Sequence, residues 1–299
     1  MATEVTAPAD TGGRELSETI RVLVPEPNIR QDLRAAAIVW RRELIRFRSD
    51  RLRLITGLIQ PVLFLFVLGT GLSALASHGL PSGVDFKTFI YPGVLAMSVL
   101  FTAIFSAASI VWDREFGFLR EMLVAPVSRA ALVVGKCLGG ATVATLQGIV
   151  FLILAGFAHV PYNPVLMLTL IGELLLLSFT LTAFGVMMAA RIKQIQAFMA
   201  LTQMLVMPLF FLSGALYPLT GLPAWLAVLT RFDPLTYIVD PMRQAVFSHL
   251  NLNPLAVHQL APGITWAGWP VPVWLSLAIV AAIGLGMLMV AIIEFRKTE

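Results

Sequence analysis

The chain has 299 residues, of which 58% are hydrophobic and 13% are charged, and its mean hydropathy is +0.85. This composition is too apolar for an ordinary soluble domain and indicates a polytopic membrane protein. The single cysteine, Cys137, excludes an internal disulfide and a cysteine metal site, and the net charge of +4 comes from basic residues beside membrane-length segments, which argues against nucleic-acid binding.

Two segments precede the first long apolar run. Residues 1–28 contain few large apolar side chains and are predicted to form a disordered cytoplasmic tail. Between residues 29 and 53, apolar residues such as Trp40 and Phe47 recur at helical spacing among arginines. This pattern predicts an amphipathic helix at the membrane interface, although a charged helix in water would show the same pattern.

Six apolar runs of membrane-crossing length follow, and they predict an all-α polytopic membrane protein with six transmembrane helices. The transmembrane domain covers residues 54–293, and a cytoplasmic C-terminal tail, 294–299, follows it. The predicted spans are approximately 54–76, 88–111, 130–158, 165–190, 195–216 and 273–293.

Lysine and arginine are distributed unevenly between the two sides that six spans define. Of the 21 basic residues, only Lys87, Arg231 and Arg243 lie in connections on the side opposite the termini. Because basic residues are enriched in cytoplasmic connections, both termini are predicted to be cytoplasmic, in a multi-pass protein of the inner (plasma) membrane.

Residues 112–129 (WDREFGFLREMLVAPVSR) form the densest charged segment between two apolar runs. As a helix, this segment would place Phe116 and Leu119 on one side and most of its charges on the other. It is therefore predicted to be a short cytoplasmic surface helix available to a partner, with a solvated loop as the alternative. Ser128 is predicted to cap the helix that follows.

The long connection at residues 217–272 contains an apolar stretch, 222–229, that is too short to cross the membrane. Proline and tryptophan accompany this stretch, which suits short interfacial or re-entrant helices at the outer leaflet. The four histidines of the chain fall in connections on this outer side, far apart in sequence, and do not indicate a metal site.

No nucleotide-binding loop of the form Gly-x-x-x-x-Gly-Lys-Ser/Thr occurs in the sequence. The chain is therefore not expected to be an enzyme or to bind a cofactor itself. Polar residues within the spans are candidates for a substrate path, because polar groups inside a membrane are costly. These candidates are Glu173, Gln60, Gln147 and Gln203, with hydrogen bonding across a helix interface as the alternative for each.

Two sequence blocks resemble one family. Residues 112–129 are similar to the signature of the ABC-2 type transporter permeases, in the branch of daunorubicin-type drug exporters and nodulation-factor exporters. Residues 208–218 (PLFFLSGALYP), together with 222–225 (LPAW), 233–237 (DPLTY) and Arg243, are similar to a later region of the same family. The resemblance extends from about residue 35 to the end of the chain.

The resemblance implies a permease subunit powered by a separate ABC ATPase. Two ATPase copies, which carry ATP and magnesium, would pair with two permeases, either identical or related. Residues 112–129 would then be the coupling helix that docks on the ATPase. The implied contact residues are Asp113, Arg114, Glu115, Phe116, Gly117, Leu119, Arg120, Glu121, Pro126 and Arg129. Glu115 alternatively complements the positive start of a helix.

The resemblance also implies an outer-leaflet re-entrant element near the exit of the transport path. Its expected residues are Ser213, Gly214, Pro218, Pro223, Trp225, Pro234 and Arg243. Three functions remain open: an exporter of a drug-like or other hydrophobic small molecule, an exporter of a glycolipid, polysaccharide or lipid-linked substrate, and a non-transporting membrane scaffold. Membrane lipid is an expected partner, and nucleic acid is not.

Overall fold

The computed structural model describes residues 29–49, 51–73, 84–117, 128–219, 221–250, 252–253, 257, 260–266 and 268–297. This part of the chain is mostly helical, as predicted for an all-α polytopic membrane protein. The tail predicted for residues 1–28 lies outside the described residues.

The helices vary in length and regularity. The α-helices are α1 (Ile29–Ser49), α2 (Arg51–Leu63), α3 (Gly69–Gly71), α5 (Phe86–Ser106), α6 (Ala108–Glu115), α8 (Arg129–Leu152), α9 (Pro164–Arg191), α10 (Ile195–Leu212), α11 (Ala224–Phe232), α12 (Thr236–Ser248) and α14 (Val273–Lys297). A π-helical turn, η1 (Phe64–Leu68), follows α2, and a 3-10 turn, η2 (Ile153–Ala158), follows α8. The described residues also contain one antiparallel pair of two-residue strands, β1 (Thr265–Trp266) and β2 (Trp269–Pro270), which the all-helical prediction missed.

In the part of the chain that the structure describes, five helical segments are long and apolar enough to cross a membrane. They are Phe86–Glu115, Arg129–Ala158, Pro164–Arg191, Ile195–Leu212 and Val273–Lys297. A further apolar helix among the described residues, Ile55–Gly71, is shorter. At about 1.5 Å per residue it is about 25 Å long, slightly less than the hydrocarbon core of about 30 Å. The described structure thus contains five of the six predicted spans as full-length helices.

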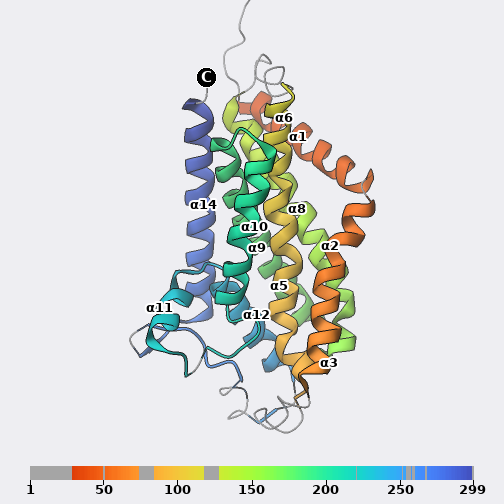
Figure 1. Cartoon of the computed structure of the whole chain (residues 1–299), viewed down its shortest axis with the longest axis vertical. Coiled ribbons are helices and arrows are strands. Elements are labelled where there is room, and N and C mark those ends of the chain that lie inside the picture. The colour runs from red at the N-terminus through yellow and green to blue at the C-terminus, as the bar shows by residue number, and fades with distance from the viewer. Residues whose placement is uncertain are drawn as a thin grey trace, which may run out of the picture.

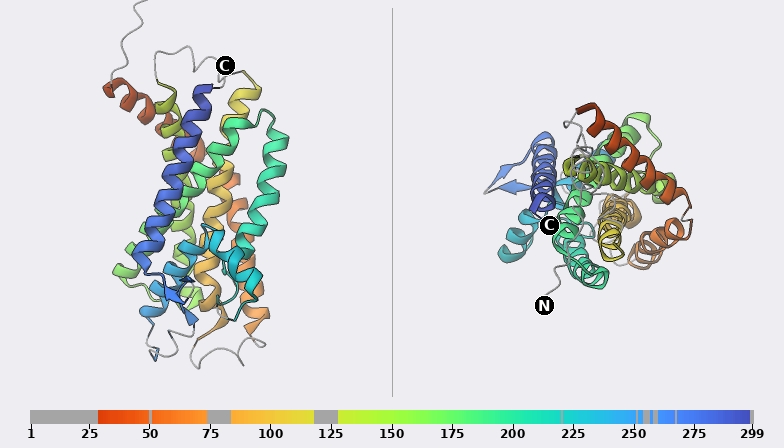
Figure 2. Two further views of the ribbon diagram at one scale, coloured as in Figure 1. Left: turned by 90° about the vertical axis from the view of Figure 1, so that its left-hand side faces the viewer. Right: turned by 90° about the horizontal axis from the view of Figure 1, so that it is seen from above.

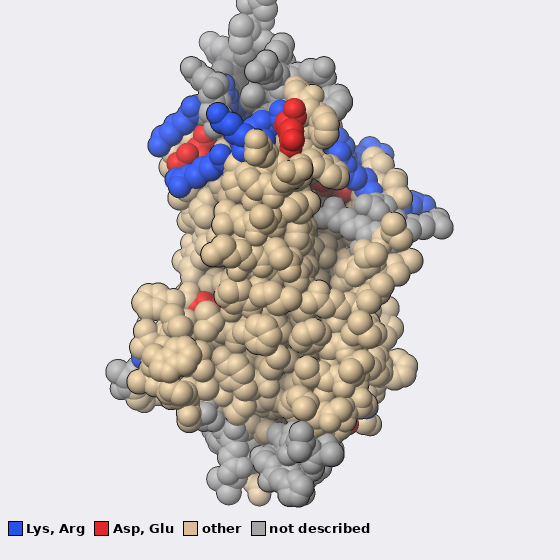
Figure 3. All heavy atoms as spheres, viewed as in Figure 1, with Lys and Arg blue, Asp and Glu red and all other residues tan. Residues whose placement is uncertain are grey.

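The long helices lie side by side along the longest axis of the molecule, and α1 crosses one end obliquely (Figure 1). α9 packs against α14, α8 and α5, and α1 packs along α8. The end of α14 lies at the same end of the bundle as α1, and lysine and arginine gather there on the face drawn in Figure 3. We call this the basic end. The opposite end, which we call the far end, carries α11, α12 and the strand pair (Figure 2).

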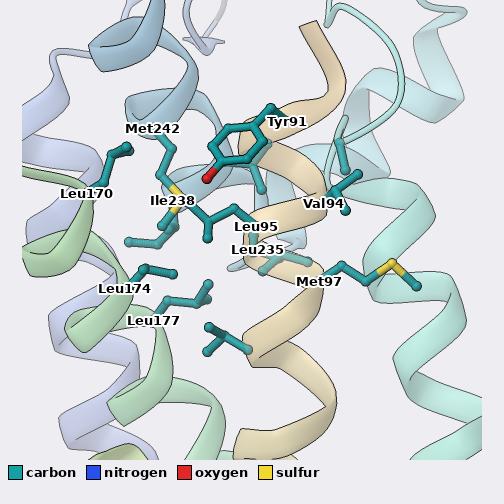
Figure 4. Packing of buried hydrophobic residues seen from close by; sticks show 14 of the residues in the cluster. Tyr91, Val94, Leu95, Met97, Leu170, Leu174, Leu177, Leu235, Ile238 and Met242 are labelled. Carbon is teal, nitrogen blue, oxygen red and sulfur yellow. The ribbon is translucent and has the colours of Figure 1, made fainter. Parts of the chain in front are cut away.

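α5 is the central helix, since nearly all of its residues between Thr88 and Ile104 are buried. Its Tyr91 and Leu95 face Leu174 of α9 and Ile238 of α12 in the core (Figure 4). Gly93 allows a further close approach, because a Cβ atom there would lie 2.5 Å from the backbone of the segment that follows α10. The far-end segments are therefore packed directly against the central helix.

Side chains at the helix starts explain where two of the long helices begin. Ser128 Oγ accepts the N–H of Ala131 at 3.1 Å, which confirms the predicted cap of α8. Asn163 Oδ1 accepts the N–H of Val165 at 2.9 Å, and Pro164 occupies the first helical position of α9, where no N–H donor is needed.

Candidate functional site

The first part of the predicted surface helix is the last turn of α6. Asp113 and Glu115 belong to α6, which continues the line of α5 and ends at Glu115, with Phe116 as its C-cap. Gly117 follows with φ +84°, a left-handed conformation that glycine adopts freely and that commonly terminates helices. The prediction of a separate helix starting at residue 112 is therefore wrong at this point, because α6 runs without a break from Ala108 to Glu115. The remaining predicted contacts Leu119, Arg120, Glu121 and Pro126 lie outside the described residues.

Arg114 joins α6 to the end of α9. Its Nη1 donates hydrogen bonds to the carbonyl oxygens of Ala189, Ala190 and Ile192 at 3.1, 3.1 and 3.0 Å. The last carbonyls of a helix have no partner within the helix and carry partial negative charge. A hydrogen bond that involves a charged group typically stabilises by about 1.5–3 kcal/mol, so Arg114 firmly attaches α6 to α9.

Glu115 joins the same helix to α10. Its Oε2 accepts the N–H of Ile195, the first residue of α10, at 2.9 Å. The first N–H groups of a helix lack internal acceptors, and a carboxylate there also complements the positive end of the helix dipole. Of the two roles predicted for Glu115, the structure thus shows the one at a helix start, but the helix is α10 rather than the one that contains Glu115.

Arg129 and Ser128 anchor the chain where it enters α8. Arg129 Nη1 donates to the carbonyl oxygens of Phe295 and Arg296, both at 3.1 Å, at the end of α14. The N–H of Ser128 donates to Asp32 Oδ1 of α1 at 3.0 Å. The far side of the charged segment is therefore attached to two further helices.

A cluster of four charged side chains, of which three are buried and Arg42 is exposed, holds α1 against α6 and α8. Lys136 Nζ lies 2.9 Å from Asp113 Oδ2 and 2.9 Å from Glu43 Oε1. It also donates to Ser109 Oγ at 2.9 Å, and Arg42 Nη2 donates to Asp113 Oδ2 at 3.1 Å. Lys136, Asp113 and Glu43 are each at most 8% exposed. Two acids and two bases balance one another, which is the condition under which buried charge is tolerated.

Together these contacts attach the described residues on either side of residues 118–127 to four helices at the basic end. On one side the chain is attached to α9 and α10 through Arg114 and Glu115, and on the other to α14 and α1 through Arg129 and Ser128.

A cavity of about 470 Å³ lies on the side of α5 and α6, between α2 and α10, which flank them in the view from above (Figure 2). Its lining residues are Arg46, Thr56, Gly57, Gln60, Phe101, Thr102, Phe105, Ala108, Ser109, Trp112 and Met199. Arg46, Thr56 and Trp112 are exposed, so the cavity reaches the molecular surface. Its volume is in the range of small-molecule binding sites.

The four polar residues predicted for a substrate path do not meet. Only Gln60 lines the cavity. Glu173 is buried in α9 with Oε2 unpaired, and Gln147 is buried in α8 beside Gly57 with its Nε2 unpaired. Gln203 is exposed on α10. The aromatic lining residues Phe101 and Phe105 escaped prediction, because they read as ordinary apolar positions of a span.

At the far end the predicted re-entrant residues form two groups. Arg243 of α12 is 1% exposed, and its Nη2 donates to the carbonyl oxygens of Gly214 at 2.6 Å and Ala215 at 3.3 Å. Its guanidinium lies 4.6 Å from the centroid of the Phe89 ring. Burial lowers the pKa of Arg243 to about 10, and the nearby carboxylate of Asp240 opposes that shift.

The second group lies around α11. Ser213 caps the turn after α10, where its Oγ accepts the N–H of Ala215 at 3.2 Å. Pro218, Pro223 and Trp225 are exposed, the last by 65%, and Pro234 is half-buried next to Asp233. An exposed tryptophan beside prolines is typical of a membrane–water interface. No cluster of histidine, cysteine, aspartate or glutamate suited to a metal ion is found among the described residues.

Comparison with known proteins assigns the chain to a family. The profile of the ABC-2 type transporter family matches residues 34–247. Transport permease ycf38 of Cyanophora paradoxa is 28% identical over 214 residues, which cover 71% of this chain and 73% of that protein. Nodulation protein J of Rhizobium leguminosarum bv. viciae is 29% identical over 239 residues, which cover 75% and 89%.

A further relative, the multidrug ABC transporter permease YbhR of Escherichia coli K12, is 28% identical over 180 residues, which cover 57% of this chain and 46% of that protein. The family match includes α6, most of α1 and the far-end helices up to α12, so it contains the helix-end contacts of Arg114 and Glu115. The chain belongs to the ABC-2 type transporter family of membrane permeases.

Proposed function

We propose that this chain is the permease subunit of an ABC exporter, which moves a hydrophobic small molecule outward with energy from a separate ATPase. The observation that carries this proposal is the attachment of both sides of residues 118–127 to the ends of α9, α10, α14 and to α1. Membership of the ABC-2 type transporter family supports the proposal. The names of two relatives support it as well: one is called a transport permease and the other a multidrug ABC transporter permease.

The orientation follows from the charge distribution. Basic residues gather at the basic end, which the positive-inside rule makes the cytoplasmic end. We take the shorter helix Ile55–Gly71 as a sixth crossing, because it packs alongside α5 and precedes a helix that runs back. Both termini are then cytoplasmic in the plasma membrane, and α1 lies along the cytoplasmic interface.

The ATPase docks on residues 112–129 and carries ATP and magnesium. The sequence has no nucleotide-binding loop, so the chain itself is proposed to be non-catalytic. Two ATPases and two permeases form the complete exporter, with the second permease an identical or related chain. The apolar outer faces of α2 and α10, which include Ile55, Ile59 and Met204, are available to lipid or to that second permease.

Coupling then proceeds through the helix ends. When the ATPases close, the docked segment moves, and Arg114, Glu115 and Arg129 carry the displacement to α9, α10 and α14. Because α6 and α10 border the cavity, a shift between them changes its shape. We propose this cavity, rather than the dispersed Glu173, Gln147 and Gln203, as the place where cargo loads.

The test separates docking from transmission in a preparation of the chain with its cognate ATPase. Glu121→Arg, in the proposed docking segment, should abolish co-purification of the ATPase. Arg114→Ala should leave the ATPase bound but reduce cargo-stimulated ATP hydrolysis about tenfold, because a rigid attachment worth one or more charged hydrogen bonds is lost.

Lys193→Ala is the matched control, since Lys193 is an exposed base in the turn between α9 and α10 with no role in these contacts. It should behave as the wild type. Binding and transport that survive Glu121→Arg would reject the coupling assignment. A chain that binds no ATPase at all would favour a non-transporting scaffold.

A further inference from the structure

Among the described residues, the cavity between α2, α5–α6 and α10 has one charged lining residue, Arg46 of α1. No aspartate or glutamate of the described part of the chain lines it. Arg46 is exposed, and it forms no ion pair within the described part of the chain. A lone cation beside a cavity attracts an anion and repels a second cation.

The rest of the lining is amphipathic. α2, which directly follows α1, contributes the polar side chains of Thr56 and Gln60. α5 and α10 contribute the apolar side chains of Phe101, Phe105 and Met199, and the hydroxyl of Thr102 on α5 donates to the Ser98 carbonyl of its own helix at 3.5 Å. A ligand that fills this space would therefore present a polar group towards α1 and α2 and apolar surface towards α5 and α10.

The position of these residues along the helices matches the depth of a lipid head group. Thr56 and Gln60 lie in the first three turns of α2, within about 14 Å of its start at Arg51. Arg46 lies in the last turn of α1, which crosses the basic end of the bundle. Cationic side chains at this depth commonly contact anionic head groups, while apolar side chains beneath them contact acyl chains.

We propose that this cavity binds an acidic amphiphile, whose anionic head group pairs with Arg46 and whose apolar tail lies against Phe101, Phe105 and Met199. The role of this amphiphile as transported cargo rests on the exporter function proposed above; its binding does not. A cationic drug could contact the aromatic side chains, but its charge would be repelled by Arg46, and no acidic side chain of the described lining would offset that repulsion. A neutral hydrophobe would leave Arg46 and Gln60 without partners.

The same cavity adjoins the charge cluster that holds α1 against α6 and α8. Ser109 lines the cavity, and its Oγ accepts a hydrogen bond from Lys136 Nζ at 2.9 Å. Trp112 lines it as well and immediately precedes Asp113, which pairs with Lys136 at 2.9 Å. A bound amphiphile therefore contacts the helix that leads to the proposed ATPase-docking segment.

Binding is tested with a dibrominated stearate, which quenches nearby tryptophan, and with its neutral methyl ester. The protein is a variant in which Trp112 is retained and the other five of the six tryptophans are replaced by phenylalanine, studied in neutral detergent at a pH at which the acid is ionised. The acid should quench Trp112 at lower concentration than the ester. Arg46→Ala should raise the concentration needed for the acid about tenfold and leave that for the ester unchanged.

Arg48→Ala is the matched control, since Arg48 is an exposed arginine of the same helix that does not line the cavity. Native mass spectrometry of stearate and methyl stearate bound to the otherwise wild-type chain repeats the comparison without tryptophan replacements. Preference for the acid that depends on Arg46 but not on Arg48 would support the site in either measurement.

Three results would overturn the proposal. Equal binding of acid and ester would remove the requirement for charge. Equal losses in Arg46→Ala and Arg48→Ala would indicate general attraction to a basic helix. Competition by inorganic phosphate as strong as that by the stearate would indicate a free-anion site. Because no ATPase is used, failure here leaves the exporter function untouched, and failure of the coupling test leaves this site untouched.

Discussion

The two ends of the molecule stabilise buried charge in different ways. At the basic end, charged side chains pair with one another and with helix ends that are distant in sequence, as Arg114 does with the end of α9. At the far end, Arg243 and Asp233 are held by backbone groups within 30 residues of themselves, since Arg243 contacts Gly214 and Asp233 contacts Leu235. The basic end therefore joins helices to one another, whereas the far end fixes local segments against the central helix.

This difference suits the proposed transport cycle. Long-range contacts at the basic end allow a displacement of residues 118–127 to reach several helices. Local contacts at the far end allow α11 and α12 to keep their own structure while the long helices move. Breaking a contact at either end should therefore have a distinct signature, which the following predictions use.

The largest loss of stability is expected for Arg243→Ala. The substitution leaves the carbonyls of Gly214 and Ala215 without their donor and Asp240 without its nearest countercharge. Removing one member of a buried charged set typically costs about 3–5 kcal/mol. We expect the melting temperature in detergent, measured by fluorescence-detected size exclusion, to fall by about 10 °C.

Two further variants serve as an intermediate case and as a control for this prediction. Arg243→Lys keeps the charge but loses the planar donor geometry, and it should lie between the alanine variant and the wild type. Arg231→Ala removes an exposed arginine of α11 and should leave the melting temperature unchanged. A melting temperature within about 1 °C of the wild type for Arg243→Ala would mean that the far end does not depend on this residue.

A smaller loss is expected for Lys136→Met at the basic end. In this variant the carboxylates of Asp113 and Glu43 still lie 3.1 and 3.8 Å from Arg42 Nη2, so their negative charge remains partly neutralised. We expect a cost of about 1–3 kcal/mol and faster hydrogen exchange along α1, because Lys136 connects that helix to α8.

The double variant Asp113→Asn with Lys136→Met distinguishes this from a general packing defect. Removing both partners leaves fewer unpaired charges than removing one. The double variant should therefore lose less unfolding free energy than the sum of the losses in the two single variants. Additive losses, or exchange that quickens in α11 and α12 as much as in α1, would contradict the proposed separation of the two ends.

The sequence predicts the long helices because hydrophobic length is a local property. It also predicts the cap at Ser128 and the confinement of lysine and arginine largely to one side of the spans. It does not predict where α6 ends, because hydropathy falls at about residue 111 while the helical hydrogen bonds continue to Phe116. Charge marks where a segment leaves the hydrocarbon, and it does not mark where a helix stops.

The candidate site is predicted less completely, for two physical reasons. The partners of Arg114 and Glu115 lie 75 to 80 residues away in the chain, so no local pattern identifies them. Phe101 and Phe105 line a cavity, yet in a span that is apolar all round, periodicity cannot distinguish a cavity wall from a packed core. Of the four polar residues predicted for a substrate path, the half-buried Gln60 of α2 is the one that lines the cavity.

The most specific contrast between the ends concerns pH. Asp233 lies between α11 and α12, outside the long helices, and it forms no ion pair among the described residues. Burial raises its pKa to about 7, and hydrogen bonds from the Leu235 N–H at 3.0 Å and the Thr236 hydroxyl at 3.5 Å oppose this shift. The folded chain therefore holds a proton here that the unfolded chain, with an aspartate pKa of about 3.9, releases.

Because the folded state binds the extra proton between about pH 4 and pH 7, stability should fall as the pH rises through that window and level off above it. Asp233→Asn keeps an oxygen that can accept from Leu235 but cannot titrate. The melting temperature of the wild type should thus rise relative to that of Asp233→Asn as the pH is lowered from about 8 to about 5. Parallel curves for the two proteins would show that the far end tolerates an ionised Asp233, and the contrast with the ion-paired basic end would then rest on Arg243 alone.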